Sequence, residues 1–220
     1  MKRGIVIACA LFAATLGAVS ALHAAATPDR WTAGTHYTVL GTPQPPAVKK
    51  GKVEVNEVFW YGCSHCFALD PRLESWKASK PAYIEFVRIP VVWGPTHAQH
   101  ARLFYTLQAL GRTDLHARVF DTIHLKGNML AAQTDEEARA LHLAFFRDNG
   151  VTEKKFNEAY DSAAVTASVE RARDLTARFE VGSVPLMVVQ GTYVTGVTLA
   201  GSEQNLLDVV EALAAKEKGR

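Results

Sequence analysis

The stretch NEVFWYGCSHCFALDP, from Asn56 to Pro71, places two cysteines two residues apart at the point where the sequence changes character. Before the cysteines, residues 52–61 are rich in valine and aromatic residues, which favour the pleated surface of a β-strand. After them, apolar residues recur at the spacing of one helix face. Cys63 and Cys66 are therefore predicted to lie where a strand ends and a helix begins.

The flanking segments predict further strands. Residues 35–40 indicate a short strand, and residues 83–92 indicate a largely apolar strand that we expect to be buried on both faces of a sheet. A strand–helix–strand unit needs a crossover connection, so strands 52–61 and 83–92 are expected to be parallel. Residues 186–190 and 193–195 predict a hairpin, and Ser202 is expected to cap a final helix.

The middle of the chain follows helical periodicity from residue 95 to about residue 179. Stop signals at Gly111, Gly127 and Asn149-Gly150 separate consecutive helices, one of which opens with the capping box Thr134-Asp135-Glu136-Glu137. The predicted fold class is therefore α/β, with a sheet interrupted by a helical insertion. Its expected parts are a sheet domain of residues 27–94 and 178–220 and an insertion of residues 95–177.

Residues 1–26 have the pattern of a secretory signal peptide. Met1-Lys2-Arg3 precedes an almost wholly apolar run, which ends in small residues suited to cleavage near Ala26. An uncleaved membrane anchor is the alternative, because the run is close to spanning length. Cys9 is interpreted as an ordinary residue of the apolar run rather than as a lipidation site.

Export would change the charge and the redox setting of the mature chain. Without residues 1–26, basic and acidic residues are equal at 22 each, so no positive field favours nucleic acid as a partner. Cys63 and Cys66 are then the two remaining cysteines, in an oxidising compartment where disulfides persist. We therefore expect the pair to be oxidised at least part of the time.

The predicted position of Cys63 favours disulfide exchange. Unpaired backbone N–H groups and the positive end of the helix dipole stabilise a thiolate at a helix N-terminus. This position therefore lowers the pKa of Cys63. Because the thiolate is the reactive form, it also raises the reactivity of Cys63. His65 can add a positive charge or a hydrogen bond, and Cys66 lies one turn further on, facing inward. Stabilising the reduced form makes the disulfide an oxidant of other thiols.

Two other interpretations of the pair remain. A structural staple is disfavoured, because so small a loop removes little entropy from the unfolded chain. A zinc site built from Cys63, His65 and Cys66 would need further ligands. His97 and His100 are spaced for one helix face, but no second cysteine pair is present and a structural zinc usually has four ligands. We therefore expect no metal and no external cofactor, with the redox-active disulfide Cys63–Cys66 as the reactive group.

A second motif completes a family resemblance. Gly182-Ser183-Val184-Pro185 stands directly before the apolar strand at residues 186–190. With the strand that leads into Cys-Ser-His-Cys and the helical insertion, this motif makes the mature chain resemble the DsbA-type thiol:disulfide oxidoreductases of the bacterial periplasm. The resemblance covers essentially the whole mature chain. It implies the fold of the thioredoxin superfamily, a thioredoxin-like fold with an inserted helical domain.

The resemblance also implies roles for four residues. Cys63 would be the nucleophile that forms a mixed disulfide with a substrate thiol, Cys66 would be its partner, and His65 would stabilise the Cys63 thiolate. Glu57 matches a buried acidic position beneath the active site, where it would help proton movement to or from Cys66. A surface strand glutamate is the alternative for Glu57.

Three further residues are implied to contact the substrate. Val184 and Pro185 match the family's cis-proline loop beside the disulfide, and Ser64 lies between the two cysteines. Ser64 departs from the family pattern, in which a proline is common at this position. The resemblance therefore implies an oxidase but does not assign it a reduction potential.

The expected function is oxidation of cysteine pairs in secreted or periplasmic proteins, by donation of the Cys63–Cys66 disulfide. Expected partners are reduced, unfolded proteins and a DsbB-like quinone-linked membrane reoxidant, and the protein is expected to be a periplasmic monomer. A disulfide isomerase or reductase of the same fold is one alternative. A non-catalytic periplasmic metal- or peptide-binding protein is another. Mutation of Cys63 separates these alternatives, because exchange would vanish while simple binding would survive.

Overall fold

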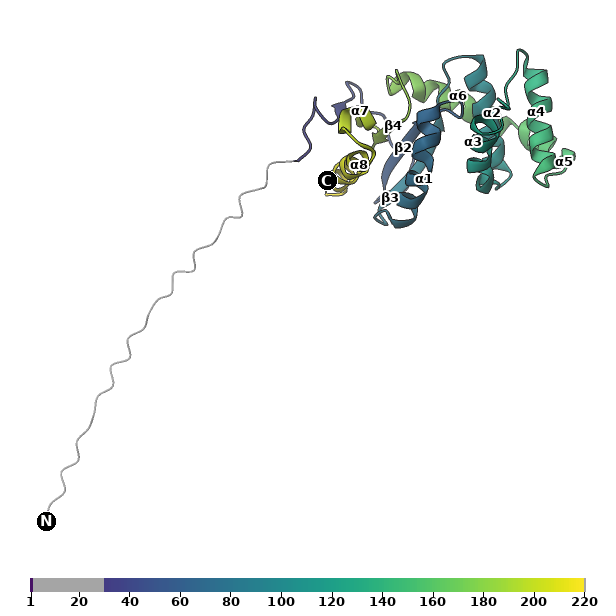
Figure 1. Ribbon diagram of the computed structural model, residues 1–220. Helices are drawn as coiled ribbons and strands as arrows, with labels where there is room; N and C mark the ends of the chain where they lie inside the picture. Colours follow the sequence, from purple (N-terminus) through teal and green to yellow (C-terminus); the bar gives the residue numbers. More distant parts are fainter. Residues whose placement is uncertain (2–29, 220) are drawn as a thin grey trace. The chain divides into compact units, whose positions relative to one another are not determined.

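The computed structural model describes Met1 and residues 30–219, so nearly all of the predicted signal peptide, Cys9 included, lies outside the described residues. Residues 31–219 contain a five-stranded mixed sheet with helices packed on both faces (Figure 1). The strands lie in the order β1-β5-β4-β2-β3. Their bounds are Thr38–Val39 (β1), Val53–Phe59 (β2), Ile84–Pro90 (β3), Leu186–Val189 (β4) and Tyr193–Thr195 (β5).

Strand β2 is the structural centre of the sheet, because it pairs on both sides. It runs parallel to β3, with Val53 opposite Ile84 and Phe59 opposite Pro90, and antiparallel to β4. Strands β4 and β5 form an antiparallel hairpin. The parallel pair and the hairpin confirm the pairing expected from the sequence.

Both faces of β2 are covered by helices. Val53 and Val55 pack with residues of α1 (Ser64–Ser79) and α8 (Glu203–Lys218). Val58, whose side chain points to the opposite face, packs with residues of α2 (Pro95–Ala109) and α6 (Ala163–Arg178). This double coverage buries every residue of β2, including two glutamates and an asparagine.

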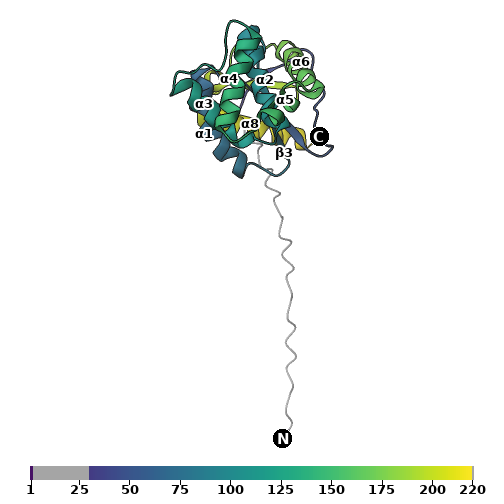
Figure 2. The same ribbon diagram turned by 90° about the vertical axis from the view of Figure 1, so that its right-hand side faces the viewer.

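The helices between β3 and β4 form a second apolar core around the phenylalanines of α3 and α4. Figure 2 shows these helices gathered on the side that faces the viewer. Besides α2 and α6, they are η1 (Thr113–Leu115), α3 (His116–His124), α4 (Asp135–Asp148) and α5 (Glu153–Tyr160). The predicted capping box is present, since the Thr134 and Glu137 side chains each bond the other's backbone N–H.

Two features differ from the sequence expectation. Strand β3 was expected to be buried on both faces, but Glu85 is exposed and Phe86, Val87 and Arg88 are only partly buried. The reason is that β3 is an edge strand, with β2 as its single neighbour in the sheet. A short helix, α7 (Val197–Ala200), also precedes α8 and was not predicted.

No helix within residues 30–219 is both long and apolar enough to cross a bilayer.

Candidate active site

Cys63 caps the N-terminus of α1, one short turn after the end of β2. Its backbone is extended, with φ −88° and ψ 117°, and its sulfur accepts a hydrogen bond from the backbone N–H of Cys66 at 3.4 Å. The Cys63 side chain is partly exposed, whereas Cys66 is completely buried, and both are free thiols. A partner thiol can therefore reach Cys63 and not Cys66.

The two sulfurs differ sharply in acidity. The pKa of Cys63 falls to about 5, chiefly through a hydrogen bond from the Cys66 side chain, with further help from the backbone N–H groups of Cys66 and His65 and from the charge of His65. Burial raises the pKa of the Cys66 thiol far above its usual range. At neutral pH the reduced pair therefore holds a thiolate on Cys63 and a proton on Cys66.

The loop before β4 lies against the cysteine pair. The Cys63 thiol lies 3.5 Å from the carbonyl oxygen of Val184, and the Val184–Pro185 peptide bond is cis. These segments are 121 residues apart in the sequence. The cis isomer is the one that the family resemblance implied.

A cavity of about 540 Å³ opens beside this loop. His65 of α1 lines one part of it. The cis-proline loop contributes Val184, Pro185 and Leu186, and the segment around α7 contributes Val197 and Leu199. His65 and Ser64 are both exposed. The structure thus brings His65, Val184 and Pro185 to one cavity, while Ser64 lies between the two cysteines at the start of α1.

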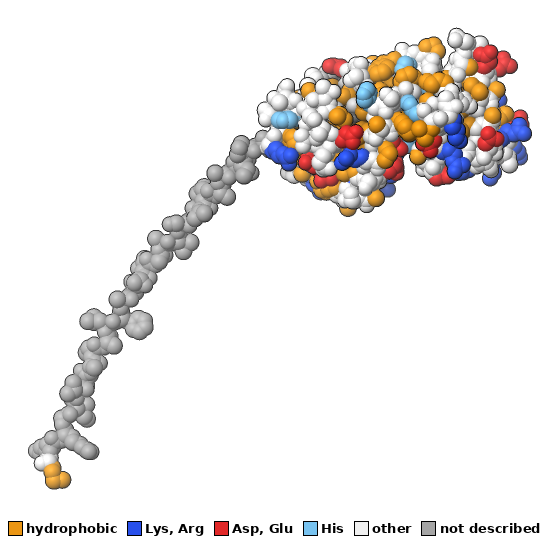
Figure 3. Space-filling view, in the orientation of Figure 1, with side chains coloured by type: hydrophobic (Ala, Val, Ile, Leu, Met, Phe, Trp, Pro, Cys, Tyr) orange, Lys and Arg blue, Asp and Glu red, His pale blue; other side chains and the backbone are white. Residues whose placement is uncertain are grey.

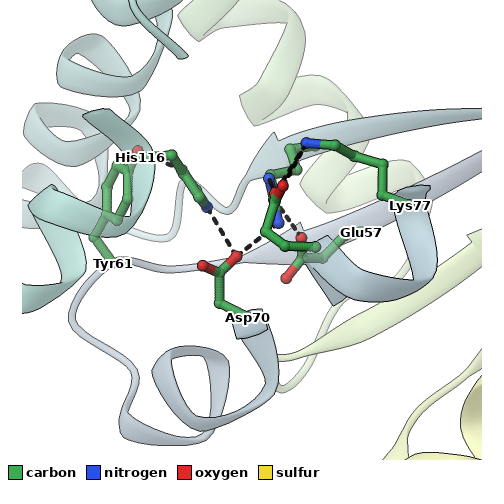
Figure 4. A network of polar contacts seen from close by, with 7 residues as sticks. Glu57, Tyr61, Asp70, Lys77 and His116 are labelled. Atoms are coloured by element: carbon green, nitrogen blue, oxygen red, sulfur yellow. Dashed lines mark hydrogen bonds and ion pairs between the residues drawn. The ribbon is translucent and has the colours of Figure 1, made fainter. Parts of the chain in front are cut away.

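Glu57 is buried in β2 and belongs to a network of polar contacts (Figure 4). Arg88 donates hydrogen bonds to three carboxylates, those of Glu57 at 2.7 Å, Asp70 at 2.6 Å and Glu74 at 2.7 Å. Burial raises the pKa of Glu57 to about 7, although Arg88 opposes the rise. Glu57 is therefore a buried acid that can hold a proton near neutral pH, and its alternative as a surface residue is wrong.

Four members of this network were not predicted from the sequence. Arg88, Asp70, Tyr61 and His116 are all at least largely buried, and His116 links two of the others. Its Nδ1 lies 2.7 Å from the Tyr61 hydroxyl, and its Nε2 lies 3.4 Å from an oxygen of Asp70. Only Arg88 left a signal in the sequence, as one of two charged residues, with Glu85, in a largely apolar strand.

The two histidines weighed as zinc ligands have other neighbours. His97 and His100 lie beside the Trp60 ring, with centroid distances of 4.5 Å and 6.0 Å. Across residues 30–219, no three histidine, cysteine or acidic side chains are placed to hold a metal ion.

Comparison with known proteins gives consistent results in sequence and structure, although no protein-family model matches the chain. The thiol:disulfide interchange protein DsbA of Pseudomonas aeruginosa is 36% identical over 209 residues, which cover 94% of this chain and 96% of that protein. DsbA of Burkholderia cepacia is 35% identical over 203 residues, covering 90% and 91%. The crystal structure of P. aeruginosa DsbA matches with a TM-score of 0.78 at 36% identity and covers 87% of this chain and 97% of its own. The oxidoreductase DsbA from Xylella fastidiosa matches with a TM-score of 0.78 at 25% identity, covering 86% and 98%.

Proposed function

Because the chain belongs to the DsbA family of thiol:disulfide interchange proteins, we propose that Cys63 and Cys66 form the disulfide that it donates to exported proteins. A substrate thiolate attacks Cys63, the Cys63–Cys66 bond breaks, and Cys66 leaves with a proton. The second substrate thiolate then attacks the substrate sulfur of the mixed disulfide, and Cys63 leaves as a thiolate. Two electrons pass to the pair; Cys66 keeps one proton and the other goes to solvent.

The single observation that carries this proposal is the contrast between the two sulfurs. An accessible sulfur with a pKa of about 5 leaves readily as a thiolate and stabilises the reduced form. A buried sulfur with a raised pKa is shielded from attack by other thiols. Together they favour transfer of the disulfide to a substrate over retention by this chain.

Glu57 supplies the proton that Cys66 needs as it leaves. A Cys66 thiolate is strongly disfavoured by burial, so proton transfer has to accompany cleavage of the disulfide. Glu57 is buried and has a pKa of about 7, so a large part of it is protonated at neutral pH. His65 acts at the other sulfur, where its charge stabilises the Cys63 thiolate.

The substrate binds as an extended segment beside the cis-proline loop. The Val184 carbonyl lies next to the Cys63 sulfur, so a substrate cysteine bonded to Cys63 brings its own backbone alongside Val184 and Pro185. The cavity of about 540 Å³ takes apolar side chains near that cysteine, and Ser64, exposed beside Cys63, contacts the substrate segment. Figure 3 shows apolar side chains gathered with histidines on the face near α2, α3 and α6, which suits an unfolded substrate.

We propose the wider setting by analogy with the family. The protein works as a monomer in the periplasm after cleavage of residues 1–26, needs no cofactor besides its disulfide, and is reoxidised by a DsbB-like quinone-linked membrane protein. Residues 27–94 and 178–220 form the thioredoxin-like domain, and residues 95–177 form the helical insertion. Substrates are reduced, unfolded secreted or periplasmic proteins.

A transfer experiment tests this function. Oxidised protein lacking residues 1–26 is mixed with an unfolded protein that carries one pair of reduced cysteines. We expect one substrate disulfide to form for each Cys63–Cys66 pair that is reduced, as counted by thiol alkylation and mass spectrometry. Binding of the substrate without any loss of its thiols would contradict the proposal and favour a non-catalytic binding protein.

A further inference from the structure

Helix α3 of the helical insertion contacts Tyr61 with both of its terminal residues. His116, its first residue, lies 2.7 Å from the Tyr61 hydroxyl through Nδ1. His124, its last residue, lies 2.8 Å from the Tyr61 carbonyl oxygen through Nε2. Tyr61 is fully buried and stands two residues before Cys63. One helix therefore bonds both the side chain and the backbone of the residue that leads into the cysteine pair.

The direction of the hydrogen bond from His124 follows from the groups involved. A carbonyl oxygen can only accept, so Nε2 of His124 carries the hydrogen. Burial raises the pKa of Tyr61 well above its usual range, so its hydroxyl keeps its proton while it hydrogen-bonds Nδ1 of His116. His124 is further fixed by Phe67 of α1, whose ring stacks on it at a centroid distance of 4.7 Å and an angle of 4°. Helix α3 therefore holds Tyr61 through two hydrogen bonds, and a parallel ring contact with Phe67 holds His124 in place.

The Tyr61 carbonyl, which His124 bonds, belongs to a turn that has two possible forms. Cys63 donates its N–H to the Trp60 carbonyl at 3.0 Å, so Trp60, Tyr61, Gly62 and Cys63 form a β-turn. The central peptide of such a turn can rotate between type I and type II, and type II needs a positive φ at the third residue. Gly62 tolerates either sign, and here its φ is not positive. The bond from His124 to Tyr61 holds the central peptide in the observed orientation.

We propose that His116 and His124 are positioning residues, which hold the turn at residues 60–63 so that the Cys63 sulfur faces the N–H groups at the start of α1. The inference rests on the proposed role of Cys63 as the exchanging cysteine. Without the bond from His124, the turn that leads into Cys63 loses a restraint, and we infer that the 3.4 Å approach of the Cys63 sulfur to the Cys66 backbone nitrogen depends on that turn. The helical insertion thus sets the reactivity of a cysteine that belongs to the other part of the fold.

The test compares His124→Phe with His124→Gln. Phenylalanine keeps the ring that stacks on Phe67 but cannot donate to the Tyr61 carbonyl, whereas the glutamine side-chain amide can replace the Nε2 donor. We expect His124→Phe to raise the pH at which the Cys63 thiolate forms, followed by its ultraviolet absorbance, because groups at the start of α1 lower the Cys63 pKa. The equilibrium constant for oxidising glutathione should fall by about twofold to tenfold, the loss of one hydrogen bond. His124→Gln should restore both values toward those of the unaltered protein.

His142→Phe is the matched control. His142 also bonds a backbone carbonyl, that of Leu130 at 2.8 Å, but this carbonyl is not part of the turn. We expect His142→Phe to lower the thermal midpoint of unfolding and to leave both sulfur measurements unchanged.

Three results would overturn the inference. They are unchanged sulfur measurements in His124→Phe, equal changes in His142→Phe, or a folded His124→Gln variant that behaves like His124→Phe. Each differs from failure of the proposed function, which would appear as the lack of an acidic, redox-active Cys63 in the unaltered protein.

Discussion

Replacing Cys63 by serine is expected to reduce disulfide transfer to the uncatalysed background, a loss of roughly a thousandfold or more. Cys63 is the sulfur that other thiols can reach, and Cys66 is fully buried with a strongly raised pKa. The remaining Cys66 cannot take over, because it is neither accessible nor ionised at neutral pH. The loss of substrate thiols after mixing with an equal amount of oxidised unaltered protein or of Cys63→Ser, with no other oxidant present, measures the effect.

Cys66→Ser gives the complementary result. In this variant Cys63 keeps its exposed position, but the cysteine that would reverse the reaction within the chain is gone. When Cys63 of this variant is first joined to glutathione in a mixed disulfide, a substrate with a single cysteine attacks the Cys63 sulfur and glutathione leaves as a thiol. We expect the mixed disulfide between Cys63 and this substrate to accumulate and to be visible by mass spectrometry without reduction. Transfer by Cys63→Ser above background, or mixed disulfides formed through Cys66 in the unaltered protein, would contradict the assignment of the two roles.

Replacing Arg88 by methionine is expected to destabilise the protein by about 3–5 kcal/mol, the typical result of removing one partner from a buried ion pair. Arg88 is the cation shared by Glu57 and Asp70, and both carboxylates are almost fully buried. Methionine has a similar length but offers no hydrogen bond, so both acids lose their partner. Urea unfolding of the oxidised protein measures the loss.

The pH dependence of that loss has a definite sign. Glu57 has a folded pKa of about 7, above its ordinary value, so its contribution to stability is present at low pH and is lost as the pH rises through 7. Arg88 lowers the pKa of Glu57, and its removal moves this pKa further upward. The deficit of Arg88→Met should therefore be larger at pH 8 than at pH 5.

Lys77→Met is the matched control for Arg88→Met. Lys77 also pairs with a carboxylate, that of Glu74 at 2.8 Å, but both side chains are more than one-third exposed. Exposed pairs contribute about 0–1 kcal/mol, so little change is expected. Equal losses in the two variants, or no loss in Arg88→Met, would show that the buried network does not depend on Arg88 for its stability.

The local part of the site could be predicted because its signals lie close together in the sequence. Valines and aromatic residues before Cys63 and the helical spacing after Cys66 place the pair at a strand–helix junction. The chemistry of helix N-termini then indicates which sulfur is acidic. The structure agrees with both, since Cys63 is the N-cap residue of α1.

The remaining parts depend on contacts between distant segments. Tyr61 meets His116 and His124 across 55 and 63 residues, and Cys63 meets Val184 across 121. The hydrophobic periodicity of one segment does not show which distant segment it will contact. The order of the strands also depends on contacts between distant segments. For this reason the largely apolar β3 was expected in the interior of the sheet, whereas it lies at the edge.

The reduction potential of the Cys63–Cys66 pair tests the central claim most directly. Equilibration in glutathione buffers, followed by tryptophan fluorescence and checked by thiol trapping, gives this potential for the protein without residues 1–26. The acidity of Cys63 predicts a value more oxidising than the glutathione couple, with the dithiol as the favoured form. A value near that of thioredoxin, about −270 mV, would contradict the account and assign the protein to the reductases of this fold.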